Sequence, residues 1–475
     1  MNDLTVNGQM SLYKKCIRHE NYLSRQESPL CEYISVEEVR AIQILTYDRT
    51  QTAISAQLNV QTCPMSRINL SFSSYSEPNK GIIGSLAHWR QDLTDYTPPN
   101  RWVWQQTGWP EFHWDDARVQ PILRQAHLNL GVLLGRAGSA GGDLDATAAL
   151  DALLQNIITS SAIEGEGLNA ASVRSSLARR LGIKLDDELA QATSSRTEGL
   201  AELMMDAVQN PQVPLSLERL LKWHCWLFPD DEPRLISIRV GQLRGDEPME
   251  VVSGRLDKPK IHFEAPPRPI LDGQLAQFID WFNQSNNPSL DPLVRAAITH
   301  FWFITLHPFD DGNGRITRVL TDLALAQTDA QSIRLYAMSA TILVNRSDYY
   351  RILEKSQASD LNITDWLEWF LLTLNTTLQM ALATIDRTLQ KRRFWQQFHT
   401  ANFSVEQRKI LNRLLDGGER GFEGGISAAQ YQKVAKVSKA TATRHLSDLL
   451  DKGCLQKLPG GGRSTRYQIT GGFDE

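Results

Sequence analysis

The sequence predicts a mostly α protein that carries one inserted β-hairpin and ends in a winged helix-turn-helix unit. Apolar residues recur at helical spacing through the middle of the 475-residue chain. Residues 249–263 instead alternate apolar and polar side chains around a polar turn, which indicates two paired strands. Beyond about residue 400, three short helical segments precede a second hairpin with a glycine-rich tip, an order typical of a winged helix.

Composition indicates a globular protein of two to four domains, with 41% hydrophobic residues, 22% charged residues and a net charge of −4. This charge argues against a protein that nucleic acid coats along its whole length. The five cysteines form no CxxC pair, so reduced thiols in a cytoplasmic protein are expected. We expect no membrane contact, because no apolar run approaches the ~20 residues of a transmembrane helix.

The N-terminal half divides into an extension and a helical module. Residues 1–95 carry no recognisable chemistry and are taken as an extension of unknown role. Residues 96–185 form the predicted module, which opens with a tryptophan-rich segment that should pack against a neighbouring helical domain. Its main helical pattern runs from Asp145 to Ile163 and stops at the glycines of "EGEG". Further helices are expected at 169–181, 185–208, 215–227, 270–285, 291–305, 313–327 and 363–385.

Residues 400–475 form the predicted winged helix-turn-helix, and this part of the chain is locally basic. Ser438 is suited to cap the third helix, and polar or basic residues follow near its exposed start. A DNA contact through 438–466 is one interpretation, and a protein-docking module is the other. The residues expected to face DNA are Lys439, Thr441, Thr443, Arg444, Arg463 and Arg466.

The segment "HPFDDGNGRITR", residues 307–318, concentrates the chemistry of the chain. Gly312, Asn313 and Gly314 lie between a loop and a helix, where backbone N–H groups can converge on an anion and the helix dipole favours negative charge. Arg315 and Arg318 are three residues apart and therefore share a helix face near that anion. The segment predicts a site for more than one phosphate group.

A polyphosphate site usually carries Mg²⁺, for which Asp311 is the natural ligand, whereas Asp310 should point away. His307 is the one group here that can accept a proton near neutral pH. A base beside a Mg²⁺-bound polyphosphate implies a hydroxyl that attacks phosphorus. The sequence contains no P-loop, protein-kinase or HExxH zinc signature that would place this chemistry elsewhere.

At these residues the chain resembles the Fic family, whose signature is HxFx[D/E]GNGRxxR. The fixed positions are filled by His307, Phe309, Asp311, Gly312, Asn313, Gly314, Arg315 and Arg318. The resemblance covers about residues 100–470 and implies a Fic-type helical catalytic core at 186–390. In that core, the hairpin at 249–263 would be the flap on which a target protein docks as an added strand.

The resemblance implies transfer of AMP from Mg-ATP to a Ser, Thr or Tyr hydroxyl of a protein, with self-modification included. His307 would be the general base and Asp311 the Mg²⁺ ligand. The phosphates would be held by Gly312, Asn313, Gly314, Arg315 and Arg318. Tyr349, Tyr350 and Gln357 match positions where relatives contact the nucleotide, and plain packing is an equal interpretation of these three residues.

"SSAIEG", residues 160–165, fits the family's inhibitory pattern [S/T]xxxE[G/N] through Ser160, Glu164 and Gly165. It ends a predicted inhibitory helix at about 146–165. By that pattern Glu164 pairs with Arg318, and ATP then binds with its α-phosphate turned wrongly for attack. In some relatives the same glutamate supports removal of AMP.

Two other functions stay open. One is a DNA-binding regulator whose Fic fold mainly senses nucleotide, although sensing alone requires no general base such as His307. The other is a Fic enzyme that transfers a different phosphate-containing group. Relatives often form homodimers, so a homodimer is also expected from the resemblance.

Overall fold

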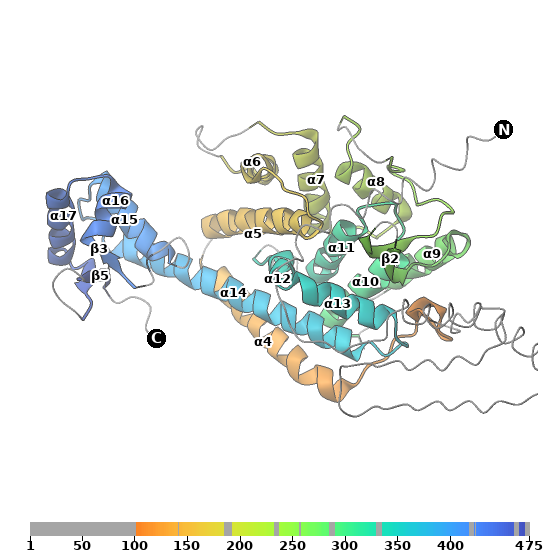
Figure 1. The fold of residues 1–475 in the computed structure, drawn as a ribbon. Helices are drawn as coiled ribbons and strands as arrows, with labels where there is room; N and C mark the ends of the chain where they lie inside the picture. The colour runs from red at the N-terminus through yellow and green to blue at the C-terminus, as the bar shows by residue number, and fades with distance from the viewer. Residues whose placement is uncertain are drawn as a thin grey trace, which may run out of the picture. The chain divides into compact units, whose positions relative to one another are not determined.

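The computed structural model describes residues 101–140, 142–184, 192–231, 237–255, 258–284, 290–328, 335–417, 422, 424–459 and 465–470 (Figure 1). The extension predicted at 1–95 and Arg463 of the C-terminal hairpin lie outside these residues. Within them the protein is mostly helical, with a two-stranded and a three-stranded antiparallel sheet. The predicted fold class, mostly α with one inserted hairpin, is confirmed. No helix in the described residues is long and apolar enough to span a membrane.

The tryptophan-rich segment packs against the helical core, as predicted. It contains a short 3₁₀ helix, η3 (Val103–Gln105). Trp102 is buried and meets Phe263 of the hairpin edge to face, with ring centroids 5.4 Å apart. Trp109 packs on Trp302 in the same geometry at 6.2 Å. Such edge-on aromatic pairs each add about 1 kcal/mol beyond the buried area, so this segment is anchored at two places.

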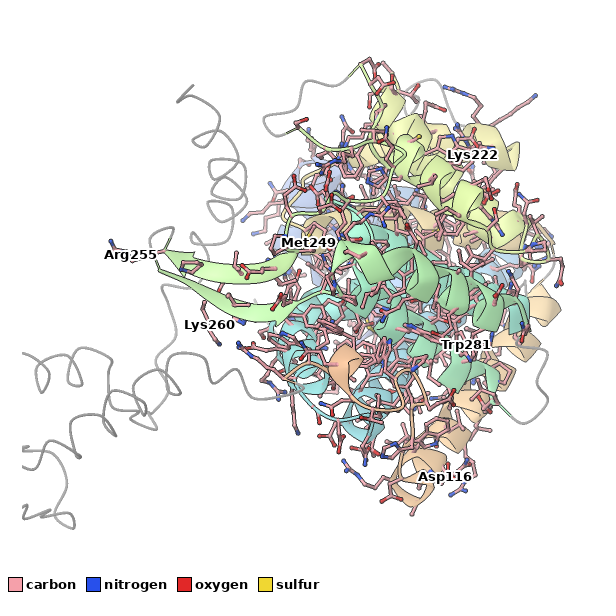
Figure 2. All side chains as sticks on the ribbon, turned by 90° about the vertical axis from the view of Figure 1, so that its right-hand side faces the viewer. Asp116, Lys222, Met249, Arg255, Lys260 and Trp281 are labelled. Carbon is pink, nitrogen blue, oxygen red and sulfur yellow. The ribbon has the colours of Figure 1, made fainter. Side chains whose placement is uncertain are left out.

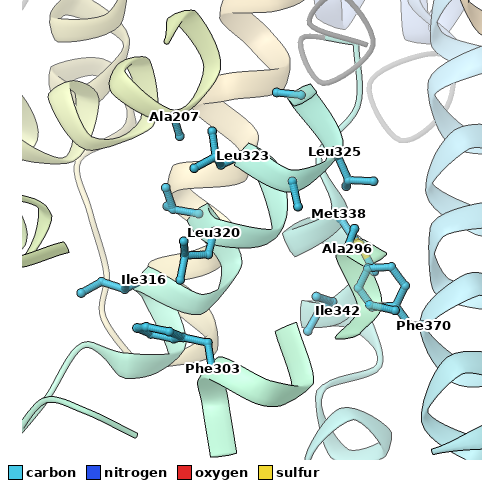
Figure 3. Packing of buried hydrophobic residues seen from close by; sticks show 14 of the residues in the cluster. Ala207, Ala296, Phe303, Ile316, Leu320, Leu323, Leu325, Met338, Ile342 and Phe370 are labelled. Atoms are coloured by element: carbon cyan, nitrogen blue, oxygen red, sulfur yellow. The ribbon is translucent and has the colours of Figure 1, made fainter. Parts of the chain in front are cut away.

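The helices of the main core surround one central pair, α10 and α11. α10 begins after Asp291, whose side chain caps the helix, and every residue from Leu293 to Leu306 is buried. Figure 3 shows Ile316, Leu320 and Leu323 of α11 among side chains of α7 and α10. The helices are α4 (Asp116–Ala140), α5 (Gly142–Ile163), α6 (Ala170–Leu181), α7 (Ser195–Gln209), α8 (Leu217–Leu227), α9 (Arg268–Gln284), α10 (Pro292–Leu306), α11 (Asn313–Thr328), α12 (Met338–Val344), α13 (Arg346–Gln357) and α14 (Thr364–Gln397).

Two predicted helix limits were wrong. The helix expected at 185–208 begins only at Ser195, because Ser194 is extended and its hydroxyl accepts the N–H of Thr197 as an N-cap. The helix expected at 363–385 continues to Gln397, since no glycine or proline interrupts 364–397. The apolar pattern fades before the helix ends, and Phe394 in its last turns already belongs to the apolar cluster of the C-terminal unit.

The predicted hairpin is present as β1 (Glu250–Arg255) and β2 (Lys258–Glu264), paired antiparallel with Val251 opposite Phe263. A bulge follows Val251, which increases the local twist. Figure 2 shows the hairpin extending from the helical core, with Met249 at its base and Arg255 toward its outer end. Its base is fixed to the core by the buried Phe263, while Arg255 is exposed.

The C-terminal unit has its own apolar core, built around Ile410, Tyr431 and Leu446. Its helices are α15 (Val405–Asp416), α16 (Ala428–Ala435) and α17 (Lys439–Asp451), and its strands are β3 (Ile426–Ser427), β4 (Leu455–Lys457) and β5 (Arg466–Ile469). The sheet order is β3-β5-β4. The two-residue strand β3 was not predicted, because it is too short for an alternating pattern. Ser438 caps α17 by accepting the N–H of Thr441, as expected.

Candidate functional site

His307 ends α10 in the left-handed backbone region, with φ of 49°. This conformation costs a non-glycine residue about 1 kcal/mol, so neighbouring contacts must hold it. The buried Arg244 does so: its Nε donates to the carbonyl of His307 at 2.9 Å, and its backbone N–H donates to the carbonyl of Pro308 at 2.9 Å. Arg244 also donates to the carbonyl of Pro266. Sequence reasoning missed this residue, since a single arginine in a loop carries no pattern.

The ring of His307 is oriented by its own helix. Nδ1 lies 3.1 Å from the carbonyl oxygen of Ile304, and a carbonyl only accepts hydrogen bonds. Nδ1 therefore carries the proton in the neutral ring, and the lone pair is on Nε2. This tautomer suits a general base, and it follows from the last turn of α10 alone.

Asn313 holds the loop together rather than offering its side chain to a ligand. Its Oδ1 accepts the N–H of Phe309 at 2.9 Å, and its Nδ2 donates to the carbonyl of Phe309 at 2.7 Å. The predicted phosphate contact of Asn313 stays a prediction. Only the backbone N–H of Asn313, which starts α11, is left for an anion.

A buried histidine that the sequence analysis did not single out supports the same loop. The ring of His224 stacks on Phe309, with centroids 4.4 Å apart. Its Nδ1 accepts the N–H of Gly241 at 3.1 Å, so Nε2 carries the proton and donates to the carbonyl of Asp311 at 3.3 Å. Burial lowers the pKa of His224 to about 4, and the ring is therefore neutral at physiological pH.

The two carboxylates of the loop diverge as expected. Asp310 turns outward to Arg239, which contacts it at 3.1 Å. Asp311 accepts the N–H of Gly312 at 2.7 Å, lies 3.9 Å from Arg315, and has 44% of its side chain exposed. Mg²⁺ binds proteins through one or two carboxylates together with substrate phosphates, and the exposed carboxylate of Asp311 fits that requirement. No cluster of three or more His, Cys, Asp and Glu side chains suited to a metal occurs among the described residues.

Both glycines of the GNG turn are required by close contacts. Gly312 has φ of +80°, and a Cβ there would lie 2.6 Å from Leu227 and 2.9 Å from Phe228. A Cβ on Gly314 would overlap Oε1 of Glu164. The carboxylate of Glu164 therefore lies directly over the first turn of α11, where the sequence predicts a phosphate.

The predicted pair of Glu164 and Arg318 is present. Arg318 is buried, and its Nη2 donates to Oε1 of Glu164 at 2.8 Å. Its Nε donates to the hydroxyl of Ser160 at 2.8 Å, and Nη2 also donates to the Ser160 carbonyl at 3.0 Å. Gly165, in the left-handed region with φ of +77°, ends α5 directly after the glutamate. Ser160 and Glu164 of the predicted inhibitory pattern thus both contact Arg318, and Gly165 follows the glutamate where α5 ends.

The three residues predicted to contact the nucleotide lie on α13. Tyr349 is buried with its hydroxyl 3.0 Å from Nε2 of His300, and Gln357 is buried and donates to Thr305 at 3.2 Å. These are packing contacts, and a nucleotide contact by either residue stays a prediction. The hydroxyl of Tyr350 donates to the carbonyl of Ile163 at 3.4 Å, and burial raises its pKa to about 12. Both tyrosines lie close enough to interact electrostatically with Arg318.

A buried carboxyl group links α5 to α11 one turn beyond Arg318. Asn156 donates to Oδ2 of Asp322 at 2.7 Å, and the same amide accepts the N–H of Ser339 at 3.3 Å through its oxygen. Burial raises the pKa of Asp322 to about 7. The sequence analysis missed this pair, because its members lie on different helices and neither belongs to a motif.

Two segments of the chain match known protein families. Residues 102–183 match the Domain of unknown function (DUF4172), and residues 214–325 match the Fic/DOC family. The second match contains the whole loop from His307 to Gly312 and most of α11. This match agrees with the resemblance at 307–318.

Named relatives of this chain are protein adenylyltransferases. Over 88 residues it is 35% identical to protein adenylyltransferase fic-1 of Caenorhabditis briggsae, which covers 18% of this chain and 16% of that protein. Over 217 residues it is 27% identical to protein adenylyltransferase Fic of Drosophila willistoni, which covers 44% of this chain and 38% of the relative. The chain thus spans less than half the length of these relatives.

Solved structures of Fic proteins align with much of the chain. A Fic family protein from Desulfovibrio desulfuricans G20 covers 75% of this chain and 98% of its own, at 20% identity and a TM-score of 0.42. Fic-1 from Caenorhabditis elegans covers 58% of this chain and 74% of its own, at 20% identity and a TM-score of 0.39.

Proposed function

We propose that this protein is an adenylyltransferase that moves AMP from ATP to a hydroxyl of a protein and is restrained by its own Glu164. The observation that carries the proposal is the contact of Glu164 with Arg318 above Gly314. The carboxylate of Glu164 thus occupies a position that suits a more highly charged anion. His307 lies at the other end of the same loop.

The chemistry needs one proton transfer and one displacement at phosphorus. The target hydroxyl oxygen attacks the α-phosphorus of ATP while its proton passes to Nε2 of His307. The bond from the α-phosphorus to the bridging oxygen of pyrophosphate breaks, and pyrophosphate leaves. The protein contributes positioning and charge stabilisation, through the backbone N–H groups that start α11 and through Arg315 and Arg318. Mg²⁺ held by Asp311 would neutralise charge on the leaving phosphates.

Glu164 would restrain the reaction by competing for Arg318. While this pair is intact, the guanidinium is turned to Ser160 and Glu164 and is not available to a γ-phosphate. Glu164 is one-third exposed and sits where α5 ends, so it can turn away without unfolding the helix. The target protein would dock on the projecting hairpin β1–β2, as the resemblance implies. A homodimer and self-modification stay predictions.

DNA binding by the C-terminal unit is the second candidate, and one observation favours it. Lys433, Lys436, Lys439 and Arg444 are exposed on α16, on α17 and in the turn between them. No Asp or Glu occurs in 424–447 to offset their charge. A duplex backbone would therefore meet several positive side chains here. Retardation of random duplex DNA that weakens steeply between 50 and 200 mM salt, and that is lost in Lys439→Ala/Arg444→Ala, would support it. Salt-independent or absent retardation would favour a docking module.

The decisive experiment uses wild type, Glu164→Gly and Glu164→Gly/His307→Ala with Mg²⁺ and α-labelled ATP, alone and with cell lysate. We expect label on protein with Glu164→Gly and none with the double variant, while both still bind ATP. A parallel reaction with γ-labelled ATP separates AMP transfer from phosphoryl transfer. The absence of label from every variant in both reactions would overturn the proposal.

A further inference from the structure

The loop that follows α5 places two carboxylates on the phosphate site rather than one. Glu164 contacts Arg318, and the carboxylate of Glu166, two residues later, contacts Arg315 at 2.7 Å. Glu166 also contacts Arg196 in the first turn of α7. The pattern that relates the chain to its family includes neither Glu166 nor Arg196.

The local backbone explains why both carboxylates point the same way. The N–H of Glu166 donates to the carbonyl of Ser161, and that of Gly165 donates to Ala162. These two bonds form a Schellman motif around the left-handed Gly165, which reverses the chain direction at the end of α5. Glu164 in the last turn and Glu166 after the reversal therefore project toward the same end of α11.

This arrangement is unfavourable for α5 itself. Carboxylates near a helix C-terminus meet the negative end of the helix dipole, which costs free energy. The arginines that offset this cost belong to the ligand site and to α7. Glu166 is largely buried, with 18% of its side chain exposed, and Arg196 is equally covered at 19%. A buried ion pair of this kind contributes little net stability compared with apolar packing, which makes a ligand-related role the better explanation.

The two carboxylates do not provide hydrogen-bond acceptors for all the N–H groups of the arginines in the site. Arg315 is buried, with 6% of its surface exposed, and its Nε has no hydrogen-bond partner among the residues that the structure describes. Nη1 of the buried Arg318 likewise has none. Buried guanidinium N–H groups are rarely left unsatisfied, and these two lie in the site where the sequence predicts phosphates. An anion larger and more highly charged than one carboxylate would satisfy them.

We propose that Arg196 and Arg315 form an anion subsite for a terminal phosphate of the nucleotide, and that Glu166 occupies it as a built-in competitor. Arg196 is then a further phosphate-binding residue, supplied by α7 from outside the GNGRITR segment. Glu166 restrains the site independently of Glu164, because each carboxylate holds a different arginine. The inference rests on the proposed function only in naming the anion as part of a nucleoside triphosphate.

The test measures binding rather than transfer, so it stands apart from the labelling experiment. Isothermal titration of ATP and of AMP is carried out on the full chain as wild type, Glu166→Gln and Glu166→Gln/Arg196→Met. We expect Glu166→Gln to tighten ATP binding about tenfold, equivalent to about 1.4 kcal/mol, because it frees two guanidiniums. AMP, which lacks the terminal phosphates, should change less than about twofold, and Arg196→Met should reverse the gain for ATP.

Glu198 of α7 provides the matched control, because it too is a carboxylate that contacts two arginines, Arg179 and Arg180. Glu198→Gln should leave ATP affinity unchanged. If the Glu166→Gln chain does not fold, Glu166→Asp decides the matter, since the shorter side chain keeps the charge but cannot reach both arginines. An ATP Kd that is the same in wild type and in the folded Glu166 variant would overturn the inference, whether or not AMP transfer is observed. So would an equal gain in Glu198→Gln.

Discussion

Oε1 of Glu164 lies 2.8 Å from Nη2 of Arg318 and directly over the Cα of Gly314. The pair joins the last turn of α5 to the first turns of α11, which are 154 residues apart in the chain. One carboxylate thus touches both an arginine and a glycine of the GNGRxxR segment. The same contact is a tertiary restraint and an obstacle to a phosphate.

Ser160→Ala should raise AMP transfer about fivefold. The hydroxyl of Ser160 accepts Nε of Arg318 at 2.8 Å, and a hydrogen bond to a charged group contributes about 1 kcal/mol or more to holding the guanidinium in its restrained position. Initial rates with α-labelled ATP measure the effect. Ser161→Ala is the control, because the buried hydroxyl of Ser161 has no hydrogen-bond partner in the described part of the chain. Equal rates in the two variants would show that the hydroxyl of Ser160 plays no part in the restraint.

Gly312→Ala should lower the free energy of unfolding by about 2–3 kcal/mol. The added Cβ meets Leu227 at 2.6 Å and Phe228 at 2.9 Å, in a backbone conformation that disfavours any side chain. Thermal unfolding of the purified variants measures the loss. Gly273→Ala on α9 should instead be neutral or slightly stabilising, because nothing lies within 4 Å of its Cβ. A Gly312→Ala variant as stable as wild type would contradict the geometry of the turn.

Asp322→Asn should gain stability relative to wild type as pH rises from 6 to 8, because only wild type loses stability over this range. The pKa of this carboxyl is raised from an ordinary 3.8 to about 7, so the folded state holds a proton that the unfolded state has lost. Stability therefore falls as pH rises toward and through 7, by about 1.4 kcal/mol between pH 6 and 8. Asparagine keeps an acceptor for Asn156 and does not titrate. Urea unfolding at both pH values tests this, with the exposed Asp272→Asn as a control that should follow wild type.

His224→Gln should reduce the loss of stability on mild acidification. The pKa of His224 is lowered from 6.5 to about 4, so its contribution is complete above pH 6.5 and is lost as pH falls through 4. Wild type should lose up to about 3 kcal/mol across that window from this ring alone. Glutamine can donate to the carbonyl of Asp311 without taking up a proton. Denaturant titrations at pH 4.5 and 6.5 decide, and the exposed His399→Gln should keep the wild-type slope.

Much of the fold could be predicted because its signals are local. Helical spacing located α10 and α11 to within one residue, and alternation located the hairpin β1–β2. The limits that failed, at Ser195 and Gln397, depend on a cap and on a helix that outlasts its apolar stripe. Each of these two helix limits depends on one or two residues, and so few residues contribute little to a periodic pattern.

The sequence by itself determined the chemistry of the site, because His307, Asp311, the two glycines and the two arginines lie within one twelve-residue segment whose turn and helix are formed by local bonds. Only the tertiary structure decided what surrounds that segment. His224, Arg244, Arg196 and Glu166 come from separate elements, and no motif marks them. Their partners were selected by how the helices pack, and packing depends on contacts between residues far apart in the chain. Asn313 shows the same division: the motif predicted a phosphate ligand, and the folded loop uses its side chain to hold Phe309.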